Sequence, residues 1–533
     1  MSSADPSFDA IELALFASRM ESVCAEMGLQ LRLAAFSPNI RDRLDYSCAV
    51  FDAGGGLCAQ AAHIPVHLGS MAYAMAGIVA GLDWNDGDMI ILNDPYLGGT
   101  HLPDVTVVAP LFVDGRCAGF VANRAHHADI GGSSPGSMPI ARSLHDEGLL
   151  IPPGHIVRGG RVDRARLEEL TSATLNPRDA AGDFAAQIGA NRRGLERLSA
   201  LVRTMGIERY LAALDALNAY GERLAWSALA ELPPGRHGFE DRLDDDGQGH
   251  ADIPIRVVIE RRDDHVHVDF TGSAPQVNGN VNCPLSVTAA GVLYAFRCLM
   301  PAQTPACAGS FRPIRLHVPA GTLLNARRPA AVAAGNVETS SRVVDAVLGA
   351  LARAWPERIP AASQGTMNNL AMGHAGTPSW GYYETLGGGM GAGRDGGGLS
   401  AVQTHMTNTR NTPIEVLESR YPLRVRRYAI RRGSGGAGAR SGGDGLIREY
   451  EFLAPARFTL LTERRHHAPW GLTGGESGRP GVNRLNGETL PPKVECEVQA
   501  GDVLTIETPG GGGWGIPQDQ AATDSREPDS ALR

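Results

Sequence analysis

Two glycine-rich runs near the C-terminal end place the tightest limit on how this chain can fold. Residues 384–400 contain two triple-glycine clusters, and residues 509–515 read Pro-Gly-Gly-Gly-Gly-Trp-Gly. Glycine has no Cβ and loses the most backbone entropy on folding, so neither run can form a long helix or strand. We expect the first run to be too flexible for a buried element. The 66 glycines and 34 prolines among 533 residues stay below the roughly 25–30% typical of disordered chains, which favours a loop-rich α/β or α+β protein.

Hydrophobic periodicity divides the rest of the chain into helical and strand-like parts. A long helix is predicted from residue 8 to about 35 behind Asp9 as N-cap, and two helices that break near Gly206 are predicted up to residue 232. Between these helices, apolar runs predict a hairpin, a helix and three buried strands, at 47–60, 70–82, 89–92, 104–112 and 119–125.

We therefore predict an α+β (mixed α/β) fold. Its N-terminal region is large, multi-layered and metal-binding, and its C-terminal region is Gly-rich and contains β-strands. Alternating apolar residues after residue 233 and past residue 420 indicate β-rich segments. The predicted divisions are an N-terminal α/β region over 1–232, a mixed region over 233–420, a β-rich region over 421–515 and a disordered tail over 516–533.

Charge and composition argue against several classes of partner. The formal net charge is −9 at pH 7, so no global basic field exists to attract nucleic acid or an anionic membrane. No apolar stretch reaches the roughly 20 residues that span a bilayer, and the N-terminus lacks the basic and apolar segments of a secretory leader. The eight cysteines form no C-x-x-C pair, which is typical of reduced thiols. We expect a soluble cytoplasmic protein.

The basic residues are almost all arginine. The chain has a single lysine, Lys493, in the sequence Pro-Pro-Lys-Val-Glu. A phosphate-binding loop of the G-x-x-x-x-G-K-[ST] type needs a lysine directly after a glycine loop. This chain therefore has no such loop of its own.

Histidines and aspartates gather around the second and third predicted strands. His101 and Asp104 flank a proline before one strand, and His126, His127 and Asp129 follow the strand that returns beside it. Two histidines and an aspartate at adjacent strand ends predict a first shell for a divalent metal such as Zn, Mn or Fe, because imidazole nitrogens do not suit Mg or Ca. The alternative is that these histidines cap strand ends and bond loop carbonyls.

Three residues upstream are further candidates. His63 and His67 have the four-residue spacing of helical ligands, but Pro65 between them is expected to disrupt the helix, so they either bind a metal or line a pocket. Asp45 precedes a predicted strand and can supply a ligand oxygen or pair with the neighbouring arginines.

Other motifs carry less information. The glycine runs can present backbone N–H groups to an anion, but without a strand before and a helix after them they favour tight turns and close packing. The acidic run 244–247 lacks the spacing of a calcium loop and predicts a hairpin turn. The absence of a G-x-S-x-G elbow leaves serine hydrolase chemistry without support.

Taken in order, these motifs resemble the hydantoinase B/oxoprolinase family, which includes B-type subunits of ATP-dependent hydantoinases and lactamases and is related to acetone carboxylase α-subunits. The resemblance extends from about residue 8 to 515. It rests on Arg43-Leu-Asp-Tyr-Ser-Cys48, His63-Ile-Pro-Val-His-Leu-Gly-Ser-Met71, Asn93-Asp-Pro-Tyr96, Gly99-Thr-His-Leu-Pro-Asp-Val105, His126-His-Ala-Asp-Ile-Gly-Gly132, Glu147-Gly148, Asp269-Phe-Thr-Gly272, Gly335-Asn-Val-Glu-Thr-Ser340 and Thr508-Pro-Gly-Gly-Gly-Gly-Trp-Gly515.

The resemblance implies a metal centre and a partner. The implied ligands are Asp45, His101, Asp104 and His126, all present in this sequence. The implied partner is an A-type hydantoinase/oxoprolinase subunit that binds ATP and Mg, expected here as a separate chain in a hetero-oligomer.

The implied reaction opens a hydantoin, 5-oxoproline or another lactam ring. The A-type subunit phosphorylates the amide carbonyl oxygen, and a metal on this chain activates the water that attacks it. His127 or Asp129 is predicted as general base. Two alternatives remain at this point: an α-type subunit of an ATP-dependent ketone carboxylase, and a non-catalytic subunit that stabilises an active partner.

Overall fold

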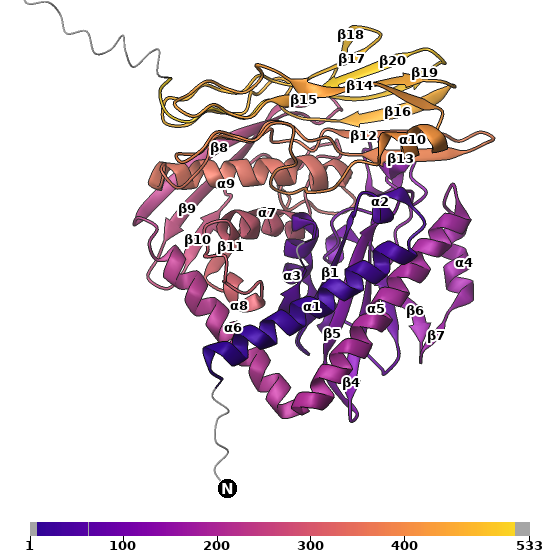
Figure 1. The fold of residues 1–533 in the computed structure, drawn as a ribbon, viewed down its shortest axis with the longest axis vertical. Helices are drawn as coiled ribbons and strands as arrows, with labels where there is room; N and C mark the ends of the chain where they lie inside the picture. The colour runs from indigo at the N-terminus through magenta and orange to yellow at the C-terminus, as the bar shows by residue number, and fades with distance from the viewer. Residues whose placement is uncertain (1–7, 62, 518–533) are drawn as a thin grey trace, which may run out of the picture.

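The fold is a mixed α/β arrangement of four sheets and the helices packed on them (Figure 1). The structure is a computed structural model that describes residues 8–61 and 63–517. The predicted tail lies almost wholly outside the described residues. Within them, no helix is both long and apolar enough to cross a membrane.

The N-terminal part is a seven-stranded antiparallel sheet between two helical layers. Its strand order is β2-β1-β5-β4-β3-β6-β7. Cys48 and Val50 pack into a core with α1 and α5, whereas Ala49 and Phe51 pack into a core with α3 on the other face. The strands are β1 Tyr46–Phe51, β2 Leu57–Gln60, β3 Met89–Leu92, β4 Asp104–Val113, β5 Arg116–His126, β6 Gly154–Arg158 and β7 Arg161–Val162. Burial on both faces explains why β4 and β5 read as continuous apolar runs.

The start of the first helix and the break at Gly206 match the sequence prediction. The helix α1 starts behind Asp9, whose side chain accepts from the Glu12 N–H in a capping box, as expected for an acidic N-cap. Gly206, at φ 81°, separates α5 from α6, a backbone angle that glycine adopts without cost. The helices are α1 Ala10–Ala34, α2 Pro38–Arg41, α3 Pro65–Ala80, α4 Arg164–Ser172, α5 Pro177–Met205 and α6 Ile207–Leu229, with 3-10 turns η1 Pro95–Leu97, η2 Pro135–Ser137 and η3 Leu144–Asp146.

The prediction for Pro65 was wrong. Pro65 is the first residue of α3 rather than a break in it, because a proline at the first helical position removes an N–H that has no partner in the helix anyway. His67 therefore lies in the first turn of α3, which begins five residues before the predicted start at residue 70.

The middle of the chain adds a second sheet with order β11-β10-β9-β8, packed on α9. The predicted boundary near residue 233 falls between α6 and β8, and the acidic run 244–247 lies at the hairpin between β8 and β9 as predicted. The elements are β8 Gly235–Asp245, β9 Ala251–Arg261, β10 Val266–Asp269, α7 Leu285–Arg297, α8 Ala308–Phe311, β11 Ile314–His317, η4 Gly335–Thr339 and α9 Ser340–Ala354.

The C-terminal part is a sandwich of two sheets, seen at the top of Figure 1. One sheet has the order β13-β12-β16-β19 and the other β14-β15-β20-β17-β18, and a core that includes Tyr450 and Phe458 fills the space between them. The first sheet joins strands from both sides of the predicted boundary at 420. The elements are β12 Asn369–His374, β13 Trp380–Glu384, α10 Ile414–Arg420, β14 Leu423–Arg431, β15 Gly445–Phe452, β16 Ala456–Leu461, β17 Val482–Leu485, β18 Glu488–Leu490, β19 Lys493–Val498 and β20 Val503–Glu507.

The glycine runs interlock, so the expectation that the first is too flexible to be buried is wrong for its first part, residues 384–392. The Gly389 N–H donates to the Pro509 carbonyl, the Ala392 N–H to the Gly512 carbonyl and the Gly511 N–H to the Gly443 carbonyl, each at 2.9 Å. A Cβ built on Gly511 would lie 2.1 Å from the Met390 carbonyl oxygen. Close backbone packing, which only glycine permits at such contacts, buries residues 384–389, 391–392 and 509–513, whereas residues 394–397 stay exposed.

Gly511→Ala is expected to destabilise the fold by about 1–3 kcal/mol, because the added methyl forces packed backbone segments apart. Gly393→Ala is the matched control, since a Cβ there meets no atom within 4 Å, and its effect should stay within about 0.5 kcal/mol. Denaturant unfolding monitored by circular dichroism measures both. Equal midpoints for the two variants would contradict the interlocked packing.

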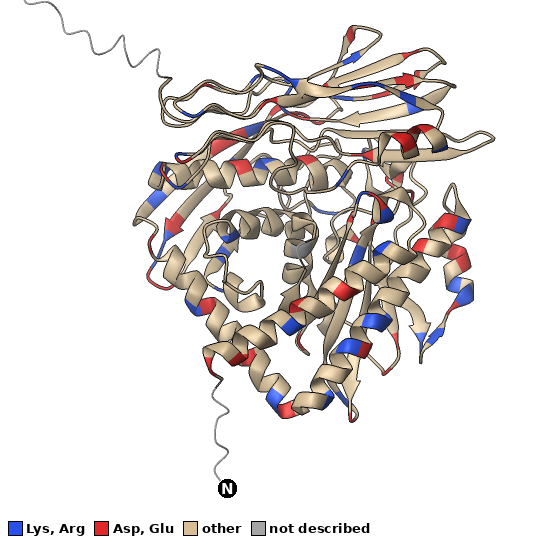
Figure 2. Cartoon of the chain, viewed as in Figure 1, with Lys and Arg blue, Asp and Glu red and all other residues tan. Residues whose placement is uncertain are grey.

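Charged side chains of both signs are interspersed along the helices (Figure 2). On α1 and α5, for example, Arg197 pairs with Glu26 at 2.6 Å and Arg193 pairs with the same carboxylate at 3.0 Å. Such exposed pairs contribute about 0–1 kcal/mol each. Residues of both charge signs therefore occur along the same helices in this view.

Candidate metal centre

One end of the N-terminal sheet brings the four predicted ligand residues to the same place. Asp104 begins β4 and is the register partner of His126, the last residue of β5. The His126 N–H donates to the Asp45 carbonyl just before β1, and the Asp104 N–H donates to the His101 carbonyl in the preceding turn. Strand pairing therefore places Asp45, His101, Asp104 and His126 at one sheet end.

His101, Asp104 and His126 form a cluster that can hold a metal ion. One ligand atom from each lies within 4.8 Å of the others, and all three side chains are buried. His101 Nε2, His126 Nε2 and Asp104 Oδ1 have no hydrogen-bond partner among the described residues. The 3.3 Å contact of His101 Nε2 with Asp104 Oδ2 lacks hydrogen-bond geometry. Leaving each of these three buried atoms without a partner would destabilise the fold by about 1–3 kcal/mol. Two imidazole nitrogens with a carboxylate oxygen are the donor set that Zn, Mn or Fe prefers.

Neighbouring groups orient both imidazoles. His101 Nδ1 lies 3.3 Å from the Ala333 carbonyl oxygen, and His126 Nδ1 lies 2.9 Å from the His127 carbonyl oxygen. A proton on each Nδ1 satisfies these carbonyls and leaves the Nε2 lone pair directed to the cluster, the usual arrangement of a histidine ligand. Burial, together with the nearby His101, holds the pKa of His126 well below its usual value, so the ring is neutral, as a ligand must be.

His67 joins the cluster as well. Its Nε2 lies 3.1 Å from Asp104 Oδ2 and 3.9 Å from Asp45 Oδ1. Burial alone would raise the pKa of Asp104, but His67 and His101 outweigh burial and hold this pKa well below its usual range. His63, the other member of the predicted pair, lies apart: its Nδ1 accepts from the Cys48 N–H at 3.1 Å.

The ion pair predicted for Asp45 is present, whereas its role as a metal ligand stays a prediction. Its Oδ2 lies 3.8 Å from the Arg43 guanidinium, and its Oδ1 faces His67. Burial raises the pKa of Asp45, and Arg43 and His67 lower it. Asp45 and His67 also line a small cavity beside the cluster, which His126, Asn336 and Tyr383 line as well. A carboxylate there can take up a ligand role as well as the ion pair.

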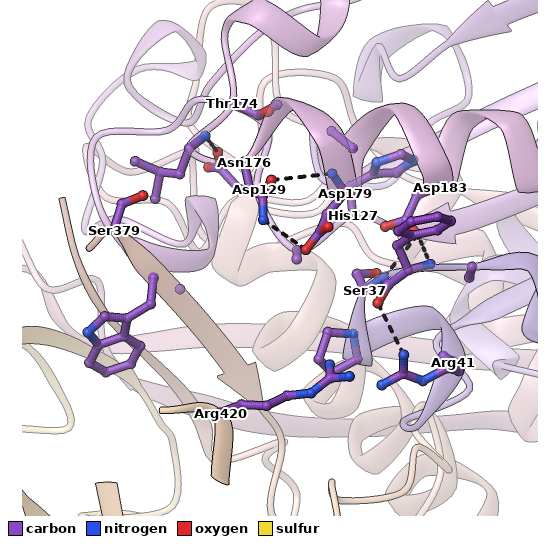
Figure 3. Close-up of a pocket in the computed structure, with 18 of the residues that line it drawn as sticks. Ser37, Arg41, His127, Asp129, Thr174, Asn176, Asp179, Asp183, Ser379 and Arg420 are labelled. Carbon is purple, nitrogen blue, oxygen red and sulfur yellow. Dashed lines mark hydrogen bonds between the residues drawn. The ribbon is translucent and has the colours of Figure 1, made fainter. Parts of the chain in front are cut away.

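The two predicted general bases lie outside the cluster. His127 points to the other side of β5, where its Nε2 lies 3.0 Å from Gln187 Oε1 and its ring packs on Phe184. Asp129 accepts from the Leu175 N–H at 2.6 Å and from the Ser137 hydroxyl at 2.9 Å. Both side chains line a different pocket (Figure 3). The structure does not bring either of them to His101, Asp104 and His126.

Several cluster neighbours were missed from the sequence. The Tyr383 ring stacks on the His126 ring at 4.9 Å, with an interplanar angle of 2°, and the Arg43 guanidinium lies 4.7 Å from the Tyr383 ring centroid. The Asn336 amide and the Thr100 hydroxyl both donate to Asp104 Oδ2, at 3.4 and 2.5 Å. Asn336 and Thr100 stand inside motifs quoted above, whereas Tyr383 stands in no motif that could have marked it.

The model of the hydantoinase B/oxoprolinase family matches residues 9–517 of this chain. The chain belongs to the hydantoinase B/oxoprolinase family. The resemblance stated from the sequence motifs is therefore confirmed over nearly the whole chain.

Relatives of this hydantoinase B/oxoprolinase chain include proteins of two lengths. It is 40% identical to 5-oxoprolinase 1 of Arabidopsis thaliana over 95% of this chain but only 42% of that protein, so it spans less than half of that relative. The crystal structure of the ATP-dependent caprolactamase from Pseudomonas jessenii superposes with a TM-score of 0.89 at 28% identity, over 97% of this chain and 94% of that one. A nucleotide-free structure of acetone carboxylase gives a TM-score of 0.86 at 19% identity, over 97% and 77% of the two chains, and shares the fold.

Replacing Tyr383 by leucine is expected to weaken binding of a divalent metal by about tenfold, because the His126 ring loses the surface that fixes its plane. Tyr383→Phe is the matched control. It keeps the stacked ring and loses only the 2.7 Å hydrogen bond to Asn369 Oδ1, at a cost of about 1 kcal/mol in stability. Competition titration with a chromogenic chelator measures both affinities. Equal affinities for the two variants would show that stacking does not support the ligand.

Glu147 supports the cluster from a distance and makes stability pH-dependent. Its Oε1 accepts from the Val332 and Ala333 N–H groups, each at 2.8 Å, and Ala333 in turn contacts His101. Burial raises the pKa of Glu147 from 4.5 to about 8. Between those values the folded chain keeps a proton that the unfolded chain has released. The stability from this group is therefore full below pH 4.5 and is lost as the pH rises through about 8.

We expect the wild type to lose on the order of 2 kcal/mol from this group between about pH 6 and about pH 9. Glu147→Gln keeps the oxygen acceptor but cannot ionise, so the free energy of unfolding should fall less over the same range. Urea titrations at the two pH values measure the difference. An identical pH dependence for variant and wild type would contradict the raised pKa.

Proposed function

We propose that this chain is the B-type subunit of an ATP-dependent cyclic amidohydrolase that opens a hydantoin, 5-oxoproline or other lactam ring. The observation that carries the proposal is the buried cluster of His101, Asp104 and His126, whose three unpaired atoms converge at one sheet end. The family supports ring hydrolysis, since relatives are named 5-oxoprolinase and ATP-dependent caprolactamase. The caprolactamase chain of nearly equal length supports a separate subunit.

An A-type partner that carries ATP and Mg is part of this proposal. An amide carbonyl is stabilised by resonance, and transfer of a phosphoryl group to its oxygen turns that oxygen into a leaving group. The single lysine cannot serve a nucleotide here, because Lys493 is buried and its ammonium lies 2.6 Å from Glu463. Activation by a separate ATP-binding subunit agrees with this arrangement.

Residues of this chain would bind the metal and shape the cavity beside it. His101, Asp104 and His126, with Asp45 beside them, would hold the divalent metal, which supplies Lewis acidity for the opening step. His67 holds Asp104 in place from the cavity side. Met367, Met406 and Val337 give the cavity an apolar wall that excludes bulk water. The roles of His127 and Asp129 as general base stay predictions, and their hydrogen bonds favour positioning of the surrounding loops.

The test is reconstitution of the purified chain with an A-type subunit, ATP and, in turn, 5-oxoproline, caprolactam and hydantoin. The expected result is ring-opened product with at least one of them, only when both subunits and ATP are present. Full turnover by the A-type subunit alone would favour the non-catalytic alternative. Consumption of bicarbonate with ATP and a ketone, and no ring opening, would favour the carboxylase alternative.

A further inference from the structure

A second pocket lies beside the cluster and is used by nothing described so far. Its volume is about 660 Å³, large enough for a small organic ligand. The end of α1, α2, the end of β5, the start of α5, β13 and the end of α10 form its walls. Figure 3 shows Arg41 and Arg420 on one side of this space and Asp129, Asp179 and Asp183 on the other.

The pocket shares its walls with the metal cluster. Pro38 lines the pocket, while the next residue, Asn39, lies 3.2 Å from His126 Nδ1. His127 lines the pocket, while His126 belongs to the cluster. On β13, Gly381 lines the pocket and Tyr383 stacks on His126. One layer of residues therefore separates the two spaces.

Asp183 supplies a negative group that is only partly used. Its side chain is 2% exposed, and Oδ1 accepts from the Phe36 N–H at 2.7 Å and the Ser37 N–H at 3.1 Å. Oδ2 makes no hydrogen bond to any described residue. The positive charge of Arg41 also acts on Asp183, but Oδ2 accepts no hydrogen bond from a described residue and Asp183 lines the pocket, so an ammonium group of a ligand can bind this oxygen.

Arg420 supplies the opposite charge. Arg41 already forms an ion pair, because its Nε lies 2.8 Å from Asp42 Oδ1. Arg420, at the end of α10, pairs with no acidic group among the described residues. A guanidinium with free donors is the usual partner of a carboxylate. Phe36, Trp380 and Tyr421 provide aromatic surface along the same pocket.

The proposed function generates a ligand with both charges. Hydrolysis of a lactam breaks the C–N bond and forms a C–O bond, which leaves a carboxylate and an amine that takes up a proton. An uncharged lactam such as caprolactam becomes a zwitterionic amino acid, and 5-oxoproline, which already carries one carboxylate, becomes glutamate. Opening a hydantoin instead gives a carbamoyl product, whose nitrogen stays uncharged. Only the lactam product matches a pocket with a free carboxylate at one side and a free guanidinium at the other.

We propose that this pocket binds the ring-opened amino acid, with its ammonium at Asp183 and its carboxylate at Arg420. This inference rests on the proposed function and narrows it: the substrate is a lactam whose product carries a free amine. Asp179, on the same wall as Asp183, adds negative charge at the ammonium end.

The test measures binding to the purified full chain by tryptophan fluorescence, since Trp380 lines the pocket. The probes are 6-aminohexanoate, L-glutamate and N-carbamoylglycine. We expect saturable binding of at least one amino acid and at least about tenfold weaker binding of the carbamoyl compound. Trp380→Phe should remove the signal.

Two variants and a control locate the charges. Arg420→Gln and Asp183→Asn should each weaken the binding of the amino acid by about tenfold. The asparagine keeps an oxygen that can accept from the Phe36 and Ser37 N–H groups. Arg427→Gln on the exposed strand β14 is the control and should bind as the wild type does. No saturable binding, equal binding of the carbamoyl compound, or an Arg420→Gln affinity equal to that of the control would overturn the proposal.

The two proposals fail separately. Binding is measured without ATP, metal or partner, so an intact pocket in a chain that supports no ring opening would count against the proposed function alone. Ring opening of a lactam by a chain that binds no amino acid would count against the pocket alone.

Discussion

His101→Ala is expected to remove the bound divalent metal and to lower ATP-dependent ring opening by about 1,000-fold or more. The loss follows because His101 contributes one of three converging donors, and Lewis acid stabilisation of this kind is worth several kcal/mol. Elemental analysis of the purified variant and turnover with the A-type subunit measure the two effects. The fold should persist, since the removed ring makes only the 3.3 Å contact with the Ala333 carbonyl as a hydrogen bond.

The matched control is His145→Ala. His145 is exposed and lies in the 3-10 turn η3 outside the cluster, so this variant should keep both metal and turnover. A His101→Ala protein that holds as much metal as the wild type, or that retains most of its turnover, would contradict the role given to the cluster.

Lys493→Met is expected to destabilise the fold by about 3–5 kcal/mol, because the buried Glu463 carboxylate loses one of its two cationic partners and its Oε1 is left without a hydrogen bond. Lys493 Nζ lies 2.6 Å from Glu463 Oε1 and 3.5 Å from Asp245. Glu463 also pairs with Arg342 at 3.2 Å. The side chains of Lys493, Glu463 and Arg342 are fully buried, and they lie where the C-terminal sandwich meets β8 and α9. Chemical unfolding followed by circular dichroism measures the loss.

Two controls separate the effect of the buried charge from a general sensitivity of stability to substitution. Lys493→Met combined with Glu463→Gln should recover part of the loss, because it removes the buried negative charge whose lysine partner is gone. Arg116→Gln breaks the exposed pair with Glu208 at 2.9 Å and should change stability by no more than about 1 kcal/mol. A Lys493→Met protein as stable as Arg116→Gln would show that the buried pair adds nothing.

Elements whose signals are local could be predicted from the sequence. The capping box at Asp9, the glycine break at Gly206 and the apolar runs of β3, β4 and β5 all encode their structure within a few residues. The mixed α/β fold followed from these elements. Pro65 was misread because a proline inside a helix and a proline at its first position look alike until the helix start is known.

Features made by contacts between distant segments could not be predicted. The first part of the run 384–400 is buried where residues 443 and 509–513 pack against it. Glycine composition indicates only that a segment is flexible. Whether the segment is ordered and buried depends on a distant segment that packs against it. Packing of backbone against backbone leaves no side-chain pattern to read.

The candidate site divides in the same way. His101, Asp104 and His126 stand on paired strands close together in the sequence, so their meeting followed from a turn and a hairpin. Tyr383 reaches His126 from β13, far along the chain. His127 was placed beside His126 by sequence adjacency, but successive residues of a strand point to opposite faces, and its side chain turns to Gln187.

The most direct test is to strip the wild-type chain with a chelator and to add back one divalent metal in the presence of the A-type subunit, ATP and a lactam. We expect ring opening to stop without metal and to return at about one equivalent of Zn, Mn or Fe per chain, with no recovery in His101→Ala. Full ring opening by the stripped chain, or recovery that is the same in His101→Ala, would contradict a metal centre at His101, Asp104 and His126.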